Sequence, residues 1–265
     1  MINIKTLLKK STLELKSCSI INPQIDAQVL LKHALKKDDL FLIKNSDNPI
    51  QNSTYQQFRR YIKRRKKHEP VAYIIGQKEF YGQTYYLNKN VLIPRPETEI
   101  LIEDCINFIQ NHTFSESAIN ILDIGTGSGC IIISLAMELE RIILNNSSIN
   151  QINFFATDIS KKALLVAKKN AKKYNLSDSI NFFHSDLLSN KKLPKKADII
   201  LANLPYLPKN HHDIDYRSLS FEPKNSLFAP ENGFFLIKKL LFEISKKYRP
   251  EYLGLEIFES HPDNF

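Results

Sequence analysis

A glycine-rich segment that follows a strongly apolar run is the clearest chemical signal in the sequence. Residues 119–124 resemble a buried strand, and a Gly-Thr-Gly-Ser-Gly loop at 125–129 leads directly into a helical pattern. The chain has only seven glycines in 265 residues, and three of them lie in this loop. Glycine permits positive φ and lets a ligand approach the backbone. A glycine loop between a strand and a helix is typical of nucleotide-type cofactor sites, and the absence of a following Gly-Lys-Ser/Thr excludes a Walker loop.

Acidic residues end the next two strand-like runs. Asp158 follows the run at 152–157, and Asp186 with Leu187 follows the run at 180–184. A carboxylate at the first position can accept both ribose hydroxyls of an adenosine. Asp186 can accept the adenine amino group, and Leu187 can pack on the ring. NAD and S-adenosylmethionine both satisfy these positions. The plainer alternatives are a helix N-cap for Asp158 and an ordinary loop carboxylate for Asp186.

The segment after the fourth strand-like run distinguishes between these two cofactors. Asn203-Leu204-Pro205-Tyr206 follows the run at 197–202. The lone pair of an amide or an exocyclic amine is delocalised, so this nitrogen is a poor nucleophile. An Asn oxygen and a backbone carbonyl can accept its two N–H bonds and aim the lone pair at a methyl donor, while Tyr206 stacks on the flat group. Hydride transfer has no use for such a segment, so the pattern favours metal-free methyl transfer from S-adenosylmethionine.

Strands and helices that alternate along the chain must position these residues. Apolar runs at 119–124, 152–157, 180–184, 197–202 and 253–258 predict strands, and runs at 129–140, 160–174 and 232–247 predict helices. Such alternation predicts βαβ units and a parallel sheet that is covered on both faces. Because the carboxyl ends of parallel strands share one edge, the glycine loop, Asp158, Asp186 and Asn203 should meet there.

The residues before this region have a different pattern. Residues 1–70 favour helices, and the Tyr- and Phe-rich stretch around Gly82 predicts a β-hairpin. We therefore expect a helical domain at 1–77, a hairpin linker at 78–93 and a methyltransferase domain at 94–265; the family resemblance described below implies that the helical domain recognises the substrate. A predicted helix carries a dense basic run at 59–67. One interpretation is that this run contacts RNA or a ribonucleoprotein. The other is that it is a solvated helix face, with Lys and Arg favoured near the C-terminal end of the helix.

The composition limits the remaining possibilities. Apolar residues make up 43% of the chain, which is typical of a folded protein. The net charge of +9 either attracts nucleic acid or is solvated surface charge, and we favour the second interpretation. No apolar run approaches the ~20 residues of a membrane span, and the first residues do not resemble a signal peptide. Three scattered cysteines favour neither a disulfide scaffold nor a metal knuckle. His211 and His212, with nearby acids, are expected to be loop surface rather than a metal site. We predict a cytoplasmic location.

These motifs resemble those of the peptide chain release factor glutamine methyltransferases. Such enzymes transfer a methyl group from S-adenosylmethionine to the side-chain amide of a Gly-Gly-Gln loop. The resemblance extends over nearly the whole chain and is most specific at Pro94-Arg95-Pro96-Glu97-Thr98-Glu99 and Phe221-Glu222-Pro223. It also includes residues 70–76, 79–82, Leu92 and Ile93 directly before the first of these motifs, the glycine loop and 203–206.

The resemblance implies an α/β fold with a Rossmann-like methyltransferase domain, preceded by a small helical domain and a β-hairpin linker. It implies S-adenosylmethionine as cofactor with S-adenosylhomocysteine as product, release factors as protein substrate, possible indirect contact with ribosomal RNA, and a monomer. The implied cofactor-binding residues are Gly125, Thr126, Gly127, Ser128, Gly129, Asp158, Asp186, Leu187 and Asn203. The implied catalytic residues are Asn203, Pro205 and Tyr206, and the implied substrate-binding residues are Asn203, Leu204, Pro205, Tyr206, Arg95 and Glu222. Arg95 alternatively braces the domain interface.

The sequence departs from the family pattern at two places. The family usually has Asn-Pro-Pro-Tyr, whereas this chain has Leu204 at the second position. That position supplies a backbone carbonyl, which Leu also has, and the following Pro205 favours an extended Leu204; we expect activity to be retained. Family members continue past Glu256 with a helix and two strands, whereas the sequence ends at Phe265. The strand at 253–258 would then be an uncovered edge.

Three alternatives stay open at this point. Asn-Leu-Pro-Tyr also occurs in ribosomal RNA adenine dimethyltransferases, which usually have a Glu before a Gly-Pro-Gly loop and place their helical domain last. Methylation of a ribosomal-protein glutamine shares much of the architecture. A non-catalytic binding module is the third possibility, against which the intact Asn203 and glycine loop argue.

Overall fold

The computed structural model describes residues 2–116, 118–143, 151–208 and 216–257. These residues form two compact units. The first contains residues up to Gly76 together with a later segment that ends at Phe221, and the second contains the remainder. His211 and His212 lie outside the described residues. The division at residues 77 and 93 that the sequence suggests stays a prediction.

The first unit consists of short helices around their own apolar core. Asn3 caps the first helix by accepting a hydrogen bond from the Thr6 N–H at 2.9 Å, and Pro23 occupies the first position of the second. Leu30, Phe58 and Ile62 are among the fully buried side chains of this core. The helices are α1 (Ile4–Lys16), α2 (Pro23–Leu35), α3 (Asp39–Lys44), α4 (Asn52–Arg65), α5 (Val71–Ile75) and α9 (Tyr216–Leu219).

The hairpin that the sequence predicts is present and packs within the second unit. Strand β1 (Gln77–Phe80) pairs with β2 (Gln83–Tyr86), and Tyr81 and Gly82 both have positive φ, as a tight two-residue turn requires. The second strand ends at Tyr86, so Val91 to Ile93 do not extend the hairpin. These residues instead belong to the segment that enters the cavity described below.

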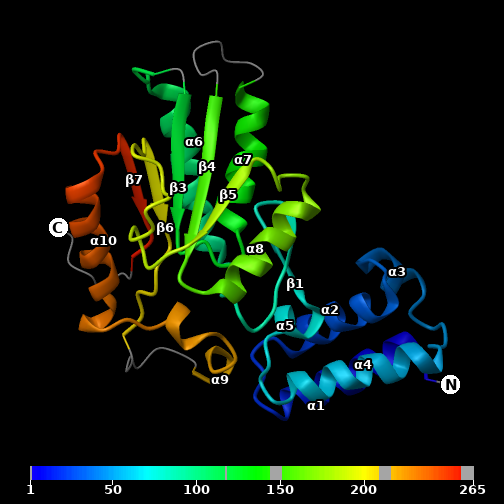
Figure 1. The fold of residues 1–265 in the computed structure, drawn as a ribbon. Helices are drawn as coiled ribbons and strands as arrows, with labels where there is room; N and C mark the ends of the chain where they lie inside the picture. Colours follow the sequence, from blue (N-terminus) through cyan, green and yellow to red (C-terminus); the bar gives the residue numbers. More distant parts are fainter. Residues whose placement is uncertain (1, 117, 144–150, 209–215, 258–265) are drawn as a thin grey trace. The chain divides into compact units, whose positions relative to one another are not determined.

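The second unit is built on a five-stranded parallel sheet in the order β5-β4-β3-β6-β7 (Figure 1). The predicted α/β, Rossmann-like fold class is therefore confirmed. Its strands are β3 (Ala118–Ile124), β4 (Gln151–Asp158), β5 (Ile180–His184), β6 (Ile199–Ala202) and β7 (Tyr252–Leu255). Among the described residues, β7 pairs with β6 alone.

Helices cover both faces of this sheet because its central strands are apolar on both sides. Ile121 and Leu201 pack in one core with α6 (Glu99–Asn111), α7 (Cys130–Ile143) and α8 (Lys161–Lys173). Leu122 and Ile200, one register position away, pack in the other core with α10 (Phe235–Lys247). Figure 1 shows α10 across the sheet from α7 and α8. Short 3₁₀-helices occur at Pro96–Thr98, Lys224–Ser226 and Glu231–Gly233.

The predicted elements differ from the observed ones mainly at their ends. The helix expected from Glu97 starts as a 3₁₀ turn and becomes α-helical at Glu99, and the helix expected from 232 starts at Phe235. Across the described part of the chain, every helix is too short or too polar to span a lipid bilayer.

Candidate active site

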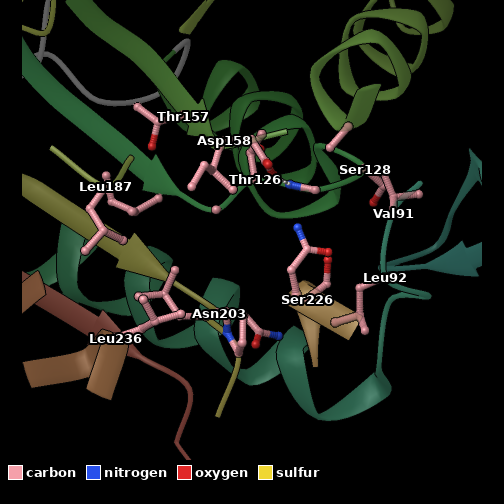
Figure 2. Close-up of a pocket in the computed structure, with 18 of the residues that line it drawn as sticks. Val91, Leu92, Thr126, Ser128, Thr157, Asp158, Leu187, Asn203, Ser226 and Leu236 are labelled. Carbon is pink, nitrogen blue, oxygen red and sulfur yellow. Dashed lines mark hydrogen bonds between the residues drawn. The ribbon is translucent and has the colours of Figure 1, made fainter. Parts of the chain in front are cut away.

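A cavity of about 330 Å³ opens at the carboxyl edge of the sheet. The ends of β3, β4, β5 and β6 all contribute to its walls, as the parallel topology requires. The predicted residues Gly125, Asp158, Asp186 and Asn203 line it together. In Figure 2 the side chains of Asp158, Leu187 and Asn203 surround this space. Its size lies within the range of ligand pockets.

The glycine loop turns sharply between β3 and α7. Gly125 has φ of 77° and Gly129 has φ of 82°, a region that other residues rarely adopt. A Cβ on Gly125 would lie 2.9 Å from Leu204 Cδ2, and one on Gly129 would lie 2.9 Å from Ile133 Cδ1. The fully buried Asn170 donates a hydrogen bond to the Ser128 carbonyl at 2.8 Å and so holds the loop from below. Both glycines are therefore needed for close packing as well as for backbone shape.

Asp158 joins the end of β4 to this loop. Its Oδ2 accepts from the Gly127 N–H at 2.9 Å, and its Oδ1 accepts from the Ser160 N–H at 2.7 Å. Burial raises the pKa of this carboxyl, while the two N–H donors oppose the shift. Each oxygen has a second lone pair, so the carboxylate can still accept ribose hydroxyls. The helix N-cap of α8 is Ser160, which accepts from the Ala163 N–H at 3.2 Å.

Most backbone N–H groups of the glycine loop donate hydrogen bonds within the protein. Gly125 and Thr126 donate to the Thr157 carbonyl, Gly127 donates to Asp158, and Gly129 donates to the Thr126 carbonyl. A pyrophosphate cradle needs such N–H groups free for the ligand. The cavity is also lined by the carboxylates of Asp158 and Asp186 and, among the described residues, by no Lys or Arg. This chemistry disfavours a phosphate ligand and suits a positively charged one.

Asp186 and Leu187 lie in the turn after β5. Leu187 has φ of 45° and is 7% exposed, so its side chain is held against the cavity in a strained backbone conformation. Ser185 Oγ donates to the Leu187 carbonyl at 2.7 Å and supports this turn. Asp186 Oδ2 is paired with Lys239 Nζ at 2.7 Å. Contact between Asp186 and an adenine amino group stays a prediction.

Asn203 lies in the cavity wall directly after β6. Its Nδ2 donates to Thr98 Oγ1 at 3.0 Å and to Glu256 Oε2 at 2.8 Å. No hydrogen bond from the described residues engages its Oδ1. Leu204 is buried against Gly125, and Pro205 also lines the cavity. Tyr206 donates from its hydroxyl to Glu256 Oε1 at 2.7 Å, and burial together with this carboxylate raises its pKa.

The Arg95 and Glu222 side chains form an ion pair. Arg95 Nη2 lies 2.6 Å from Glu222 Oε1, and the buried Glu222 also accepts from the Ile93 N–H at 3.0 Å. Glu222 thus anchors the segment that carries Val91, Leu92 and Pro94 into the cavity. Substrate contact by either residue stays a prediction.

Sequence reasoning missed several cavity residues and contacts. Thr98 and Glu256 hold the Asn203 amide, yet neither was a candidate site residue. The sequence predicts a strand over 253–258, which places Glu256 inside the strand; the observed β7 ends at Leu255, and only this earlier end puts Glu256 at the carboxyl edge of the sheet. The other missed lining residues include Val91, Leu92, Asn225, Ser226, Phe228, Phe235 and Leu236.

Comparison with known proteins yields matches over both units. Residues 6–76 match the family described as PrmC N-terminal domain, and residues 115–245 match a methyltransferase domain. A bifunctional methyltransferase of Rickettsia bellii is 35% identical, with 93% of this chain and 46% of the relative aligned. Release factor glutamine methyltransferases of Mycoplasma mycoides and Buchnera aphidicola are each 34% identical, and 78% and 82% of their lengths are aligned. The chain spans about half the length of the bifunctional relatives.

Proposed function

Because this chain belongs to the release factor glutamine methyltransferase family, we propose that it methylates the side-chain amide nitrogen of the glutamine in the Gly-Gly-Gln loop of peptide chain release factors. One observation carries the proposal. Asn203 lies in the wall of the glycine-lined cavity, with its NH2 group held by Thr98 and Glu256 and its oxygen left to accept.

S-adenosylmethionine is the proposed cofactor, and the residues present fit it. It carries a sulfonium, an ammonium and a ribose diol but no phosphate, which suits a cavity whose described lining residues include Asp158 and Asp186 but no Lys or Arg. Lys239 pairs with Asp186 but is not among these lining residues. Gly125, Thr126, Gly127, Ser128 and Gly129 would hold it with Asp158, Asp186, Leu187 and Asn203. Gly125 provides space that a Cβ would close against Leu204. When bound, this cofactor supplies an electrophilic methyl group.

The chain's own residues hold the unreactive amide. Asn203 Oδ1 and the Leu204 carbonyl each accept a hydrogen bond from one N–H of the glutamine side-chain amide. Two acceptors at fixed positions orient the nitrogen and direct its lone pair, which raises reactivity through positioning and electrostatics. Tyr206 stacks on the planar amide, and its hydroxyl bond to Glu256 steadies the ring. The buried Leu204 contributes a carbonyl in place of the more usual proline.

The test uses labelled S-adenosylmethionine with three acceptors: a purified release factor, its loop Gln→Ala variant, and ribosomal RNA. We expect label on the release factor only. Label on the RNA, or label that survives the Gln→Ala change, contradicts the proposal.

Asn203→Ala is expected to lower the transfer rate by about 100-fold or more, the loss typical of a removed oxyanion-type contact. Its affinity for S-adenosylhomocysteine should stay within about threefold, because Asp158 and the glycine loop hold the nucleoside. Asn181→Ala, which removes an exposed amide from β5, is the matched control and should leave the rate unchanged. An unaltered rate in Asn203→Ala would exclude Asn203 from the reaction.

The proposed partners follow from this substrate. We expect the enzyme to act as a monomer in the cytoplasm, to recognise the release factor through the helical first unit, and to contact ribosomal RNA only indirectly. Sedimentation of the enzyme alone and with release factor checks the stoichiometry.

A further inference from the structure

Glu256 lies immediately after β7, beside the segment that carries Asn203. Ala202 and Leu255 are register partners at the ends of β6 and β7, and the Glu256 N–H donates to the Ala202 carbonyl at 3.0 Å. The next residues of the two strands therefore emerge side by side at the carboxyl edge of the sheet. Residues 53 positions apart in sequence become neighbours in this way.

The Glu256 carboxylate contacts both polar residues of the Asn-Leu-Pro-Tyr segment. One oxygen accepts from Asn203 Nδ2 at 2.8 Å, and the other accepts from the Tyr206 hydroxyl at 2.7 Å. Glu256 is half-buried, and its backbone is fixed by the sheet. A single carboxylate thus spans the two side chains that would face a planar amide.

The chemistry of these partners decides which way the Asn203 amide faces. An Asn side chain has nearly the same shape after a 180° flip, so packing alone does not select an orientation. The Thr98 hydroxyl can donate or accept and is equally indifferent. A carboxylate has only hydrogen-bond acceptors, so Glu256 can accept a hydrogen bond from the Asn203 NH2 group but repels the Asn203 Oδ1. The flipped orientation would present NH2 to a substrate NH2, which places two donors against each other.

We propose that Glu256 is a positioning residue that orients the Asn203 amide, so that Oδ1 accepts from the substrate amide, and that restrains Tyr206. This inference rests on the proposed function, because it concerns the same amide-binding site. Glu256 does not contact the reacting atoms; it acts through Asn203 and Tyr206.

The experiment compares Glu256→Ala, Glu256→Gln and Glu251→Ala under single-turnover conditions with release factor. Glu256→Ala should slow transfer by about 100-fold, the cost of a misplaced reacting group, with the dissociation constant of S-adenosylhomocysteine unchanged. Glu256→Gln can accept from Asn203 and donate to Tyr206, so it should restore most of the rate. Glu251→Ala removes a carboxylate beside the other end of β7, where it pairs with His112, and should behave as wild type.

Exchanging the carboxylate and the amide between positions 203 and 256 distinguishes an effect on the hydrogen bond between the two side chains from a general structural effect. Asn203→Asp places two carboxylates together and should be nearly inactive. Adding Glu256→Gln supplies an N–H donor to Asp at position 203 and should raise the rate at least about tenfold over the single variant. The proposal is overturned if Glu256→Ala transfers normally, or if the exchange gives no recovery although the double variant binds S-adenosylhomocysteine normally.

A second measurement distinguishes failure of the Glu256 proposal from failure of the proposed function. The ¹⁵N side-chain NH2 resonances of Asn203, assigned by their loss in Asn203→Ala, should shift in Glu256→Ala even if release factor is not the substrate. A wild-type enzyme that does not label release factor refutes the proposed function. Unshifted Asn203 resonances refute the role of Glu256.

Discussion

Several individual residues at or near the strand ends adopt conformations or environments that cost free energy. Gly125 must have positive φ with Leu204 packed against it, and Leu187 has positive φ without the freedom of glycine. Asp123, at 0% exposure, is an acidic group buried beneath the glycine loop. Such costs concentrate where function requires a particular geometry.

Gly125→Ala should weaken cofactor binding. The new Cβ would meet Leu204 at 2.9 Å and would require φ of 77°, so the loop must move away from the cavity wall. Calorimetric titration with S-adenosylhomocysteine should show at least about tenfold weaker binding, since the loop forms part of the ligand surface.

Gly82→Ala is the control for this substitution. Gly82 has φ of 67° but nothing within 4 Å of an added Cβ, so the variant isolates the backbone effect. It should lose about 1–2 kcal/mol of stability and keep its affinity for the ligand. Equal ligand affinities in the two glycine variants would argue against packing at Gly125 as the cause.

Asp123→Asn should change how stability depends on pH. Burial raises the pKa of the Asp123 carboxyl to about 7, above its value of about 4 in an unfolded chain. The fold therefore favours the protonated form, and the stability contributed by protonation is complete below about pH 4 and is lost as the pH rises towards 7. Urea unfolding should show that the free energy of unfolding of Asp123→Asn increases relative to that of the wild type between pH 4 and pH 7. A constant difference across that interval would contradict the shifted pKa.

Among the elements, α4 shows how a basic run can be structural. Arg59 pairs with Glu14 at 2.6 Å, Arg64 with Glu69 at 2.6 Å, and Arg65 with Asp26 at 2.7 Å, all within the first unit. Much of the positive charge at 59–67 is therefore neutralised locally. Arg60 and Lys63 are exposed and are the better candidates for contact with a partner.

Arg65→Ala should destabilise the protein more than Lys63→Ala. The Arg65 and Asp26 side chains are only 13% and 14% exposed, so removing Arg65 leaves a poorly solvated carboxylate. We expect a loss of about 2–3 kcal/mol, below the cost of breaking a fully buried pair, against less than about 0.5 kcal/mol for Lys63→Ala. Denaturant unfolding measures both. Equal stability of the two variants, with RNA binding weakened in both, would favour an RNA-binding role for the whole run.

At the scale of the whole molecule, the cavity-lining residues and the core of the N-terminal helices belong to different units. Every cavity-lining residue, from Asn90 to Leu236, belongs to the second unit, while the first unit has its own core. Cofactor binding and recognition of the protein substrate are thus expected to be separable.

Leu30→Ala should test this separation. Leu30 is fully buried in the core of the first unit, and its truncation should cost about 2–5 kcal/mol. Affinity for S-adenosylhomocysteine, measured by calorimetry at a temperature where the variant stays folded, should match that of the wild type. Weakened ligand binding in Leu30→Ala would show that the first unit supports the cavity.

Local sequence patterns were enough to predict the fold class, most element positions and the edge of the sheet where the site lies. Alternating apolar runs specify strands and helices, and parallel strands necessarily bring their carboxyl ends together. The glycine loop, Asp158 and Asn203 could therefore be placed in one cavity before any coordinates were known. Element ends were less exact, as at Glu97 and Val91, because capping and tertiary packing determine where a helix or strand stops.

The contacts that orient the site were not visible in the sequence. Asn203 meets Thr98 and Glu256, which lie 105 and 53 residues away, and Glu222 reaches Ile93 across 129 residues. Only the register of β6 against β7 and the path of the segment after the hairpin bring these groups within hydrogen-bond distance. Periodicity describes which face a residue occupies, whereas amide orientation depends on which atoms approach it through space.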